Sequence, residues 1–320
     1  MIGVEKLSKH FGKVKAVDGI SFDVKEGENL ILLGTSGCGK TTTLKMINRL
    51  IEPTSGKITV NGKNVTEQQP EELRRSMGYV LQNTGLFPHY SVAENIAIVP
   101  QLLKWDKKRI DDRTRELMHK LNLDTKYLNV YPEQLSGGQQ QRVGLARALM
   151  ADPPVLLMDE PFGALDPVTR FNIRKEFIEL DELKRKTIIM VTHDVQEAFE
   201  LGDRICLMDN GKIMQAGTPA ELLFKPANTF VKSFLKEQRL QLEFKAVKLN
   251  DIWALLPNIK TRSAAGAIHC NCTVWETLEI ITAGKGNAIA ATNAVNGETK
   301  TITFTQLISS FHQYQNSEAV

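Results

Sequence analysis

A glycine-rich segment at residues 34–41 has the residue types and the spacing of a loop that binds a polyphosphate. It reads GTSGCGKT, which fits the pattern GxxxxGK(S/T), with an apolar run before it and a segment of helical character after it. Glycines let successive backbone N–H groups point inward, and the positive end of the following helix attracts an anion. Lys40 would neutralise the β- and γ-phosphates, and the Thr41 hydroxyl would bind Mg²⁺. The sequence therefore predicts a phosphate site at this loop.

Two adjacent carboxylates follow a second apolar run. Residues 155–158 are Val-Leu-Leu-Met, and Asp159 and Glu160 come next. A buried strand of a parallel sheet carries such residues to the sheet edge where ligands bind. Asp159 would hold Mg²⁺, directly or through water, and Glu160 would polarise an attacking water. Two such carboxylates alone are more often a cap or a turn, but the phosphate loop upstream favours the functional interpretation.

His193 and Gln82 also follow predicted strands, at residues 187–191 and 77–81. They are therefore expected at the same sheet edge as the carboxylates. A histidine in that position is by itself more often a loop residue with ordinary partners. Beside a triphosphate, its imidazole could donate a hydrogen bond to the γ-phosphate, and the Gln82 amide could reach both metal and water.

A second helix start with affinity for anions lies at residues 135–139, Leu-Ser-Gly-Gly-Gln. Ser136 can cap the helix that follows, and Gly137 and Gly138 would expose backbone N–H groups at its positive end. One nucleotide at Lys40 already has its loop, so this second site requires another explanation.

The elements that would position these residues form an α/β core. Strand-like runs at residues 2–7, 20–24 and 57–60, with an Asn61-Gly62 turn, indicate an antiparallel portion near the N-terminus. Residues 91–150 have helical patterns and indicate a helical insertion. Near-continuous apolar runs at 155–158, 187–191 and 204–208 alternate with helical stretches, which predicts a mostly parallel, doubly wound sheet.

Composition limits the class of protein. A chain of 320 residues has room for about two domains. Its 42% hydrophobic and 24% charged residues are ordinary for a globular protein, and a net charge of +3 is too small to suggest a nucleic-acid polycation. The four cysteines form no disulfide framework, and the Cys270/Cys272 pair, with only His269 nearby, favours ordinary side chains over a metal site. No apolar run approaches the ~18 residues of a membrane span, so membrane association is expected to come through a partner.

The order of these motifs resembles the ATP-binding subunits of ABC transporters. The phosphate loop, Gln82, LSGGQ at 135–139, LLMDE at 156–160, ALD at 164–166 and His193 follow one another as in that family. The resemblance covers residues 1 to about 235, and LSGGQ between the two nucleotide motifs is highly specific. It implies an ABC-type P-loop NTPase domain that hydrolyses ATP with Mg²⁺. It also implies a head-to-tail dimer in which residues 136–139 of one copy close over the ATP of the other.

The resemblance assigns roles to particular residues. Catalysis would fall to Glu160, His193 and Gln82, and Mg²⁺ to Thr41, Gln82 and Asp159. Phe11 would stack on adenine, and Asp166 would lie in the loop that links the two sites of the dimer. The remaining ATP contacts would come from Gly34, Thr35, Ser36, Gly37, Cys38, Gly39, Lys40, Thr41 and Thr42. The segment acting on the partner's ATP would be Leu135, Ser136, Gly137, Gly138 and Gln139.

Spacing narrows the subtype within the family. Only 95 positions separate Lys40 from Leu135, which leaves no room for the long coiled coil of DNA-repair relatives, and a single nucleotide unit argues against translation-type relatives. The resemblance then implies a peripheral subunit at the cytoplasmic face of the membrane, docked on a separate permease through residues 83–95. An exposed aromatic-rich loop without such a role is an equal alternative for that segment.

The wording GTSGCGKTTTLKMINRL, QNTGLFPHYSVAENI and THDVQEAFELGDRI looks most like ATPases of importers for osmoprotectants such as glycine betaine, carnitine or choline. That resemblance implies permease subunits, a second copy and, indirectly, an extracytoplasmic solute-binding protein as partners, and no nucleic acid. Two alternatives remain at this point: a soluble ABC-type ATPase acting on nucleic acid or ribosomes, and a binding-only regulatory module.

The C-terminal part is predicted as a helical linker at 236–249 and a small α/β unit at 250–320. The latter resembles one degenerate CBS motif, with a helix near 274–282, a strand near 288–291 and a final helix near 305–311. It departs from that family at Lys300 and Gln306, where glycine and aspartate are usual. Pairing with the same unit of a second copy is the plainer interpretation, and sensing of ionic strength is a hypothesis.

Overall fold

The computed structural model describes residues 1–257, 267–284, 288–293 and 297–318. Its backbone contacts divide the chain into two compact units, Met1–Ala216 and Gly217–Val320. The domain boundary predicted near residue 235 followed the extent of the family resemblance, and it lies inside the second unit.

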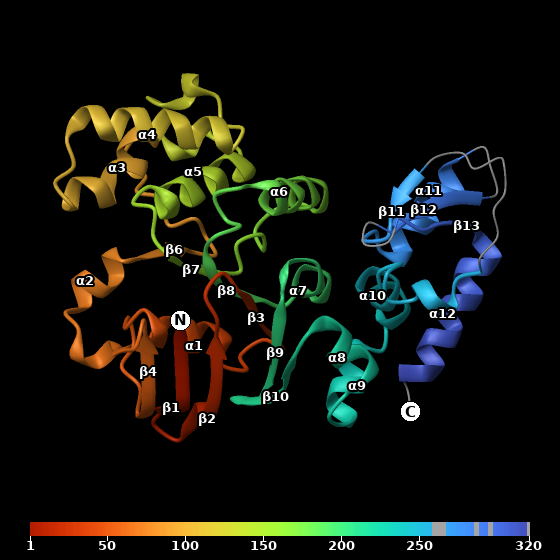
Figure 1. The fold of residues 1–320 in the computed structure, drawn as a ribbon. Helices are drawn as coiled ribbons and strands as arrows, with labels where there is room; N and C mark the ends of the chain where they lie inside the picture. Colours follow the sequence, from red (N-terminus) through yellow and green to blue (C-terminus); the bar gives the residue numbers. More distant parts are fainter. Residues whose placement is uncertain (258–266, 285–287, 294–296, 319–320) are drawn as a thin grey trace. The chain divides into compact units, whose positions relative to one another are not determined.

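A six-stranded sheet forms the core of the first unit (Figure 1), in the order β10-β9-β3-β8-β7-β6. Strands β9, β3, β8, β7 and β6 run parallel to one another, which confirms the predicted mostly parallel sheet. Leu30 and Leu32 face the core that α1 shares with the N-terminal strands, and Ile31 faces the opposite side, next to Gly202 at the end of α7. Both faces are therefore covered, which is why these strands are apolar at every position. The strands are β3 (Asn29–Gly34), β6 (Met77–Val80), β7 (Val155–Asp159), β8 (Thr187–Thr192), β9 (Arg204–Asp209) and β10 (Lys212–Gly217).

The predicted antiparallel portion is a four-stranded sheet of order β2-β1-β4-β5. Asn61 and Gly62 join β4 to β5 with φ values of 52° and 76°, as the two central residues of a type I′ hairpin turn require. The first two strands run longer than predicted, because β1 and β2 pair as far as Phe11 and Val14. The strands are β1 (Ile2–Phe11), β2 (Val14–Val24), β4 (Ser55–Val60) and β5 (Lys63–Asn64).

The predicted helical insertion lies between β6 and β7, where α3, α4 and α5 gather (Figure 1). Ser91 begins α3 with a capping box, and Asp106 caps α4 by accepting a hydrogen bond from the Arg109 N–H. The helices of this unit are α1 (Lys40–Ile47), α2 (Pro70–Arg75), α3 (Val92–Leu102), α4 (Lys107–Lys120), α5 (Gly137–Leu149), α6 (Pro167–Glu179) and α7 (Val195–Leu201), with short 3₁₀ turns at Val65–Glu67, Thr125–Tyr127 and Pro132–Gln134.

The second unit contains a three-stranded sheet of order β11-β12-β13, with β11 parallel and β13 antiparallel to β12. The predicted helices and the strand near 288–291 are present, while β11 and β13 were not predicted. The range predicted as a linker, 236–249, contains one helix, α10, and α9 ends directly before that range. The elements are α8 (Pro219–Phe224), α9 (Thr229–Leu235), α10 (Arg239–Ala246), a 3₁₀ turn (Trp253–Leu255), β11 (Ala267–His269), α11 (Val274–Ala283), β12 (Ala288–Thr292), β13 (Thr299–Thr303) and α12 (Phe304–Glu318).

None of the helices in the described ranges is both long enough and apolar enough to cross a membrane.

Candidate functional site

The glycine-rich loop connects the end of β3 to the start of α1. Gly39 has a φ of 104°, and a Cβ atom built on it would lie 2.3 Å from the Ala16 carbonyl oxygen. At Gly34, a Cβ atom would lie 2.1 Å from the Met208 carbonyl oxygen. Neither position has room for a side chain, and at Gly39 the backbone conformation also favours glycine. The close approach of β2 and β9 therefore fixes the path of the loop.

Lys40 lies inside this loop and is only 5% exposed. Its ammonium group donates hydrogen bonds to the carbonyl oxygens of Gly34 and Thr35, both at 2.8 Å. Gly39 stands at the N-cap of α1 and has no side chain to cap it. The first-turn N–H groups and the ammonium group are thus available together, and they fit a polyphosphate.

Thr41 and Asp159 meet beside the loop. The Thr41 hydroxyl donates to Asp159 Oδ1 at 2.7 Å, although 118 positions separate the two residues in the chain. Burial raises the pKa of Asp159, and the Thr41 hydrogen bond and the charge of Lys45 oppose that rise. A hydroxyl and a carboxylate in contact are the oxygen donors that Mg²⁺ takes in nucleotide sites, so the residues fit this ion.

We expect Asp159→Asn to raise the melting temperature of the nucleotide-free protein. Because burial raises the folded-state pKa, the ionised carboxylate opposes folding, and this unfavourable contribution is fully present above the folded-state pKa. The gain should therefore be largest near pH 7 and shrink as the pH falls below the folded-state pKa. The same variant should lose the extra thermal stabilisation that Mg²⁺ adds to that of ATP. Melting curves at two pH values, with ATP and with MgATP, measure both effects, and a lower melting temperature at pH 7 would contradict the prediction.

Gln82, Glu160 and His193 converge on one carboxylate oxygen. Glu160 Oε2 accepts a hydrogen bond from Gln82 Nε2 at 2.9 Å and lies 3.2 Å from His193 Nδ1. The three residues follow β6, β7 and β8, which are adjacent in the sheet, so the sequence correctly placed them at one edge. Glu160 has a φ of +45°, a backbone conformation that is uncommon outside glycine. Gln82 and His193 are exposed, with 59% of the His193 side chain accessible, whereas Glu160 is half-buried.

These side chains line a cavity of about 470 Å³, which is large enough for a small-molecule ligand. Asp159, which accepts the hydrogen bond from Thr41, does not line it. The cavity-lining residues, all predicted from the sequence, are Ser36, Gly37, Gly39, Lys40, Thr41, Thr42, Gln82, Glu160 and His193.

Phe11 does not line this cavity. It lies at the end of β1 and is 50% exposed, with Lys9 Nζ 5.1 Å from the centre of its ring. The paired strand β2 contacts the loop at Gly39, so Phe11 belongs to the hairpin that borders the site. Its stacking on adenine stays a prediction.

The LSGGQ segment also lies outside the cavity of its own chain. Ser136 caps α5 by accepting a hydrogen bond from the Gln139 N–H at 3.3 Å, and Gln139 Oε1 accepts from the Ser136 N–H at 2.9 Å. This capping box confirms the predicted helix start. Asp166 similarly caps α6 by accepting from the Thr169 N–H at 3.1 Å, and hydrogen bonds from the Thr169 hydroxyl and N–H lower the pKa of Asp166.

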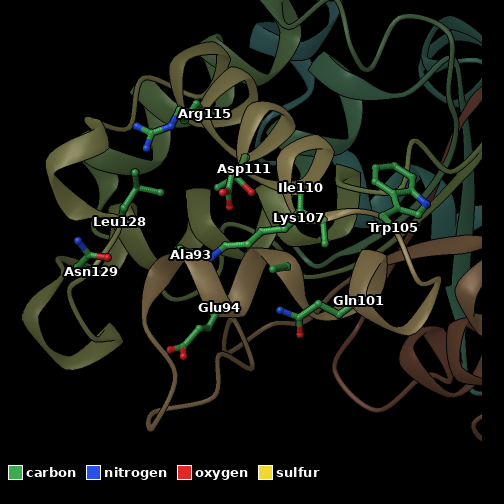
Figure 2. Close-up of a pocket in the computed structure, with 12 residues that line it drawn as sticks. Ala93, Glu94, Gln101, Trp105, Lys107, Ile110, Asp111, Arg115, Leu128 and Asn129 are labelled. Carbon is green, nitrogen blue, oxygen red and sulfur yellow. The ribbon is translucent and has the colours of Figure 1, made fainter.

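The described residues also form concave regions away from this cavity. A cavity of about 470 Å³ lies between α3 and α4. Figure 2 shows residues that border it, such as Trp105, Lys107 and Arg115. A groove of about 300 Å³ lies near residues 83–95 and includes Leu81, Gly85 and Phe87, together with Arg74, Arg75 and Arg147. The aromatic segment signalled part of this groove, but no local pattern identified its arginines.

The chain resembles curated transport proteins over most of its length. A family model described as "ABC transporter" matches residues 17–163. The glycine betaine/carnitine/choline transport ATP-binding protein OpuCA of Bacillus subtilis is 53% identical over 75% of this chain and 63% of its own length. The osmoprotectant import ATP-binding protein OsmV of Salmonella typhimurium is 50% identical over 82% of this chain and 70% of its own. The glycine betaine uptake system ATP-binding protein YehX of Escherichia coli is 54% identical over 75% of this chain and 78% of its own length.

Solved structures agree with these relatives. The dimeric bacterial ABC transporter cassette MJ0796 covers 68% of this chain and 98% of its own, with 33% identity and a TM-score of 0.62. A post-hydrolysis dimer of the same cassette is bound to ADP and Pi. The fold, the motif order and the identity of 50% and 54% to OsmV and YehX together show that the chain belongs to the family of ATP-binding proteins of ABC transporters.

Proposed function

We propose that this chain hydrolyses MgATP to power the uptake of a small solute, a quaternary-amine osmoprotectant, through a separate membrane permease. The observation that carries the proposal is the convergence of Gln82 and His193 on Glu160, beside Lys40 in one cavity. The names of the relatives support the solute class. Reconstitution with its permease, followed by ATP-dependent uptake of radiolabelled betaine, tests it, and uptake without ATP hydrolysis would contradict it.

In the proposed mechanism, the protein mainly positions charge. Lys40 and the first-turn N–H groups of α1 bind the phosphates, and Thr41, Asp159 and Gln82 would hold Mg²⁺. The ion would neutralise charge on the β- and γ-phosphate oxygens. Glu160 polarises the attacking water, and its bonds to Gln82 and His193 fix the direction of its carboxylate. His193 lines the same cavity as Lys40, so its imidazole could donate a hydrogen bond to the γ-phosphate and stabilise charge that develops there.

We further propose that two copies close head-to-tail around two nucleotides. Within one chain, residues 135–139 do not line the cavity, although Gly137 and Gly138 are suited to an anion. A second copy would bring this segment over the γ-phosphate, and the dimeric cassette with 33% identity supports that arrangement.

The groove near Phe87 is the proposed docking site for the permease. Its lining contains three arginines and no carboxylate, beside apolar residues. Tyr79 Oη and Asn48 Oδ1, from two other lining residues, are buried and have no hydrogen-bond partner among the described residues. A permease segment with apolar side chains, polar groups and an acidic residue would match this surface. The subunit would then sit peripherally on the cytoplasmic face, and a solute-binding protein would act on the other side.

We expect Phe87→Ala to reduce transport while leaving the ATPase activity of the isolated chain within about twofold, because the ring is 43% exposed and lines no part of the nucleotide cavity. The Asn95 side chain holds the backbone of Phe87: its Oδ1 accepts from the Phe87 N–H at 2.8 Å, and its Nδ2 donates to the Phe87 carbonyl oxygen at 3.1 Å. The loop should therefore keep its path without the ring. Weaker co-purification with the permease is the measurement. Leu102→Ala, at another exposed apolar position, is the matched control. Unchanged transport would remove Phe87 from the docking surface.

We assign residues 1–235 to the ATPase, 236–249 to a link and 250–320 to a tail that pairs with the tail of the second copy. Lys300 supports this assignment over nucleotide sensing, because it is 6% exposed and donates to the carbonyl oxygens of Trp253 at 2.8 Å and Leu256 at 2.9 Å. Its ammonium group therefore serves the tail itself. Removing residues 250–320 tests the sensor hypothesis, since unchanged salt dependence of transport would dismiss it.

A further inference from the structure

Helix α6 packs directly against the LSGGQ segment. A Cβ atom built on Gly138 would lie 2.9 Å from Thr169 Cγ2 and 3.2 Å from Ile173 Cδ1. One built on Gly137 would lie 3.7 Å from Leu165 Cδ2. The two glycines therefore rest on the first two turns of α6 and on the loop before it. A shift of α6 would move them, since packed interiors transmit strain.

Arg170 connects the loop before α6 with the loop that carries His193. Its Nη2 donates to the Leu165 carbonyl oxygen at 3.0 Å, and its Nη1 lies 3.7 Å from Asp194 Oδ2. Leu165 belongs to the ALD segment at 164–166, and Asp194 directly follows His193. The guanidinium is a planar fork, so one side chain can hold both loops at a fixed separation.

Asp194 transmits this contact to the backbone beside His193. Its Oδ1 caps α7 by accepting from the N–H groups of Gln196 at 2.8 Å and Glu197 at 3.2 Å. Its own N–H donates to Thr192 Oγ1 at 3.0 Å. Thr192 and Asp194, the residues on both sides of His193, are thereby fixed, and Arg170 contacts the carboxylate of Asp194.

We propose that Arg170 is a positioning residue that ties the ALD loop to the His193 loop, and that α6 thereby couples the two nucleotide sites of the dimer. The inference rests on the proposed function, in which residues 136–139 face the partner's nucleotide while Glu160 and His193 face their own. Helix α6 contacts the first set at Gly138, and Arg170 links it to Asp194, the residue directly after His193 of the second set. Closure at one site would then adjust the histidine at the other.

The same helix offers a matched control one turn later. Arg174 Nε lies 2.8 Å from Glu200 Oε2, so it also joins α6 to α7 by an ion pair. That pair bears on the last turn of α7 and not on the ALD or His193 loops. General packing between the two helices should therefore depend on Arg174 as much as on Arg170, whereas coupling should depend on Arg170 alone.

The test measures ATP hydrolysis by the full chain as a function of ATP concentration. Arg170→Met keeps the aliphatic stem, and we expect kcat to fall about tenfold because a small displacement of a catalytic group is costly. The Hill coefficient should fall toward one, while the affinity of the monomer for a fluorescent ATP analogue stays unchanged. Arg170→Lys should not restore the parent values, because a single ammonium group cannot hold both loops.

Asp194→Asn keeps a side chain that caps α7 and removes the charge, so it should lower kcat and the Hill coefficient in the same way. The double variant should be no worse than either single one, since the two act as one unit. If Arg170→Met fails to fold, Asp194→Asn carries the test. Arg174→Met should keep both the kcat and the Hill coefficient of the parent.

Parent values of kcat and Hill coefficient in Arg170→Met would overturn the proposal. Equal losses in Arg174→Met would also overturn it, because they would show a general effect of helix packing. An unmodified chain that does not hydrolyse ATP would contradict the proposed function itself. That failure is seen without any variant, so it can be told apart from a failure of the coupling proposal.

Discussion

Glu160→Gln should bind ATP normally and lose hydrolysis by about a hundredfold or more, the range expected when a general base is removed. Glu160 Oε2 is the acceptor that Gln82 and His193 share. A glutamine has an oxygen that can accept the same two bonds, so the side chain should stay in place. It cannot take a proton from the attacking water, and the chemical step should stop.

A second consequence follows for assembly. If closed dimers reopen only after hydrolysis, Glu160→Gln should accumulate as a dimer with ATP and remain a monomer with ADP. Size-exclusion chromatography with each nucleotide, alongside phosphate release, measures both effects. Glu52→Gln, at an exposed carboxylate paired with Arg49, is a control for the loss of one charge. Phosphate release at the parent rate would remove Glu160 from its proposed role.

Lys40→Ala should weaken ATP binding by about tenfold to a hundredfold, the range expected when a hydrogen bond to a charged group is lost. Lys40 is buried beside the uncapped start of α1, where few other cations could replace it. Its present acceptors are carbonyl oxygens of the loop, which can turn to water when the ammonium group is absent. The loss should therefore appear in affinity far more than in folding.

Titration with a fluorescent ATP analogue gives the affinity, and circular dichroism checks the fold. Lys57→Ala, at an exposed position of β4, is the matched control and should leave affinity unchanged. The two variants should fail at different steps. Glu160→Gln stops turnover with the ligand bound, whereas Lys40→Ala prevents the ligand from binding, so reversed results would interchange the proposed roles.

The sequence determined the parts of the site that short segments encode. The Gly34–Thr41 spacing, the apolar run ending in Asp159 and Glu160, and the cap at Ser136 each depend on neighbours within a few residues. Alternation of strands with helices also predicted the sheet and the edge where these residues meet. These features were predictable because backbone conformation and hydrophobic periodicity are local properties.

Only the tertiary structure decided which of these side chains touch. The contact between Thr41 and Asp159, the shared oxygen of Glu160, and the link from Arg170 to Asp194 join residues on different strands and helices. The orphaned Tyr79 hydroxyl and the division of the chain at Gly217 likewise follow from packing between distant segments. No short pattern encodes these features, because they depend on the order of strands in the sheet and on the way side chains fill the space between elements.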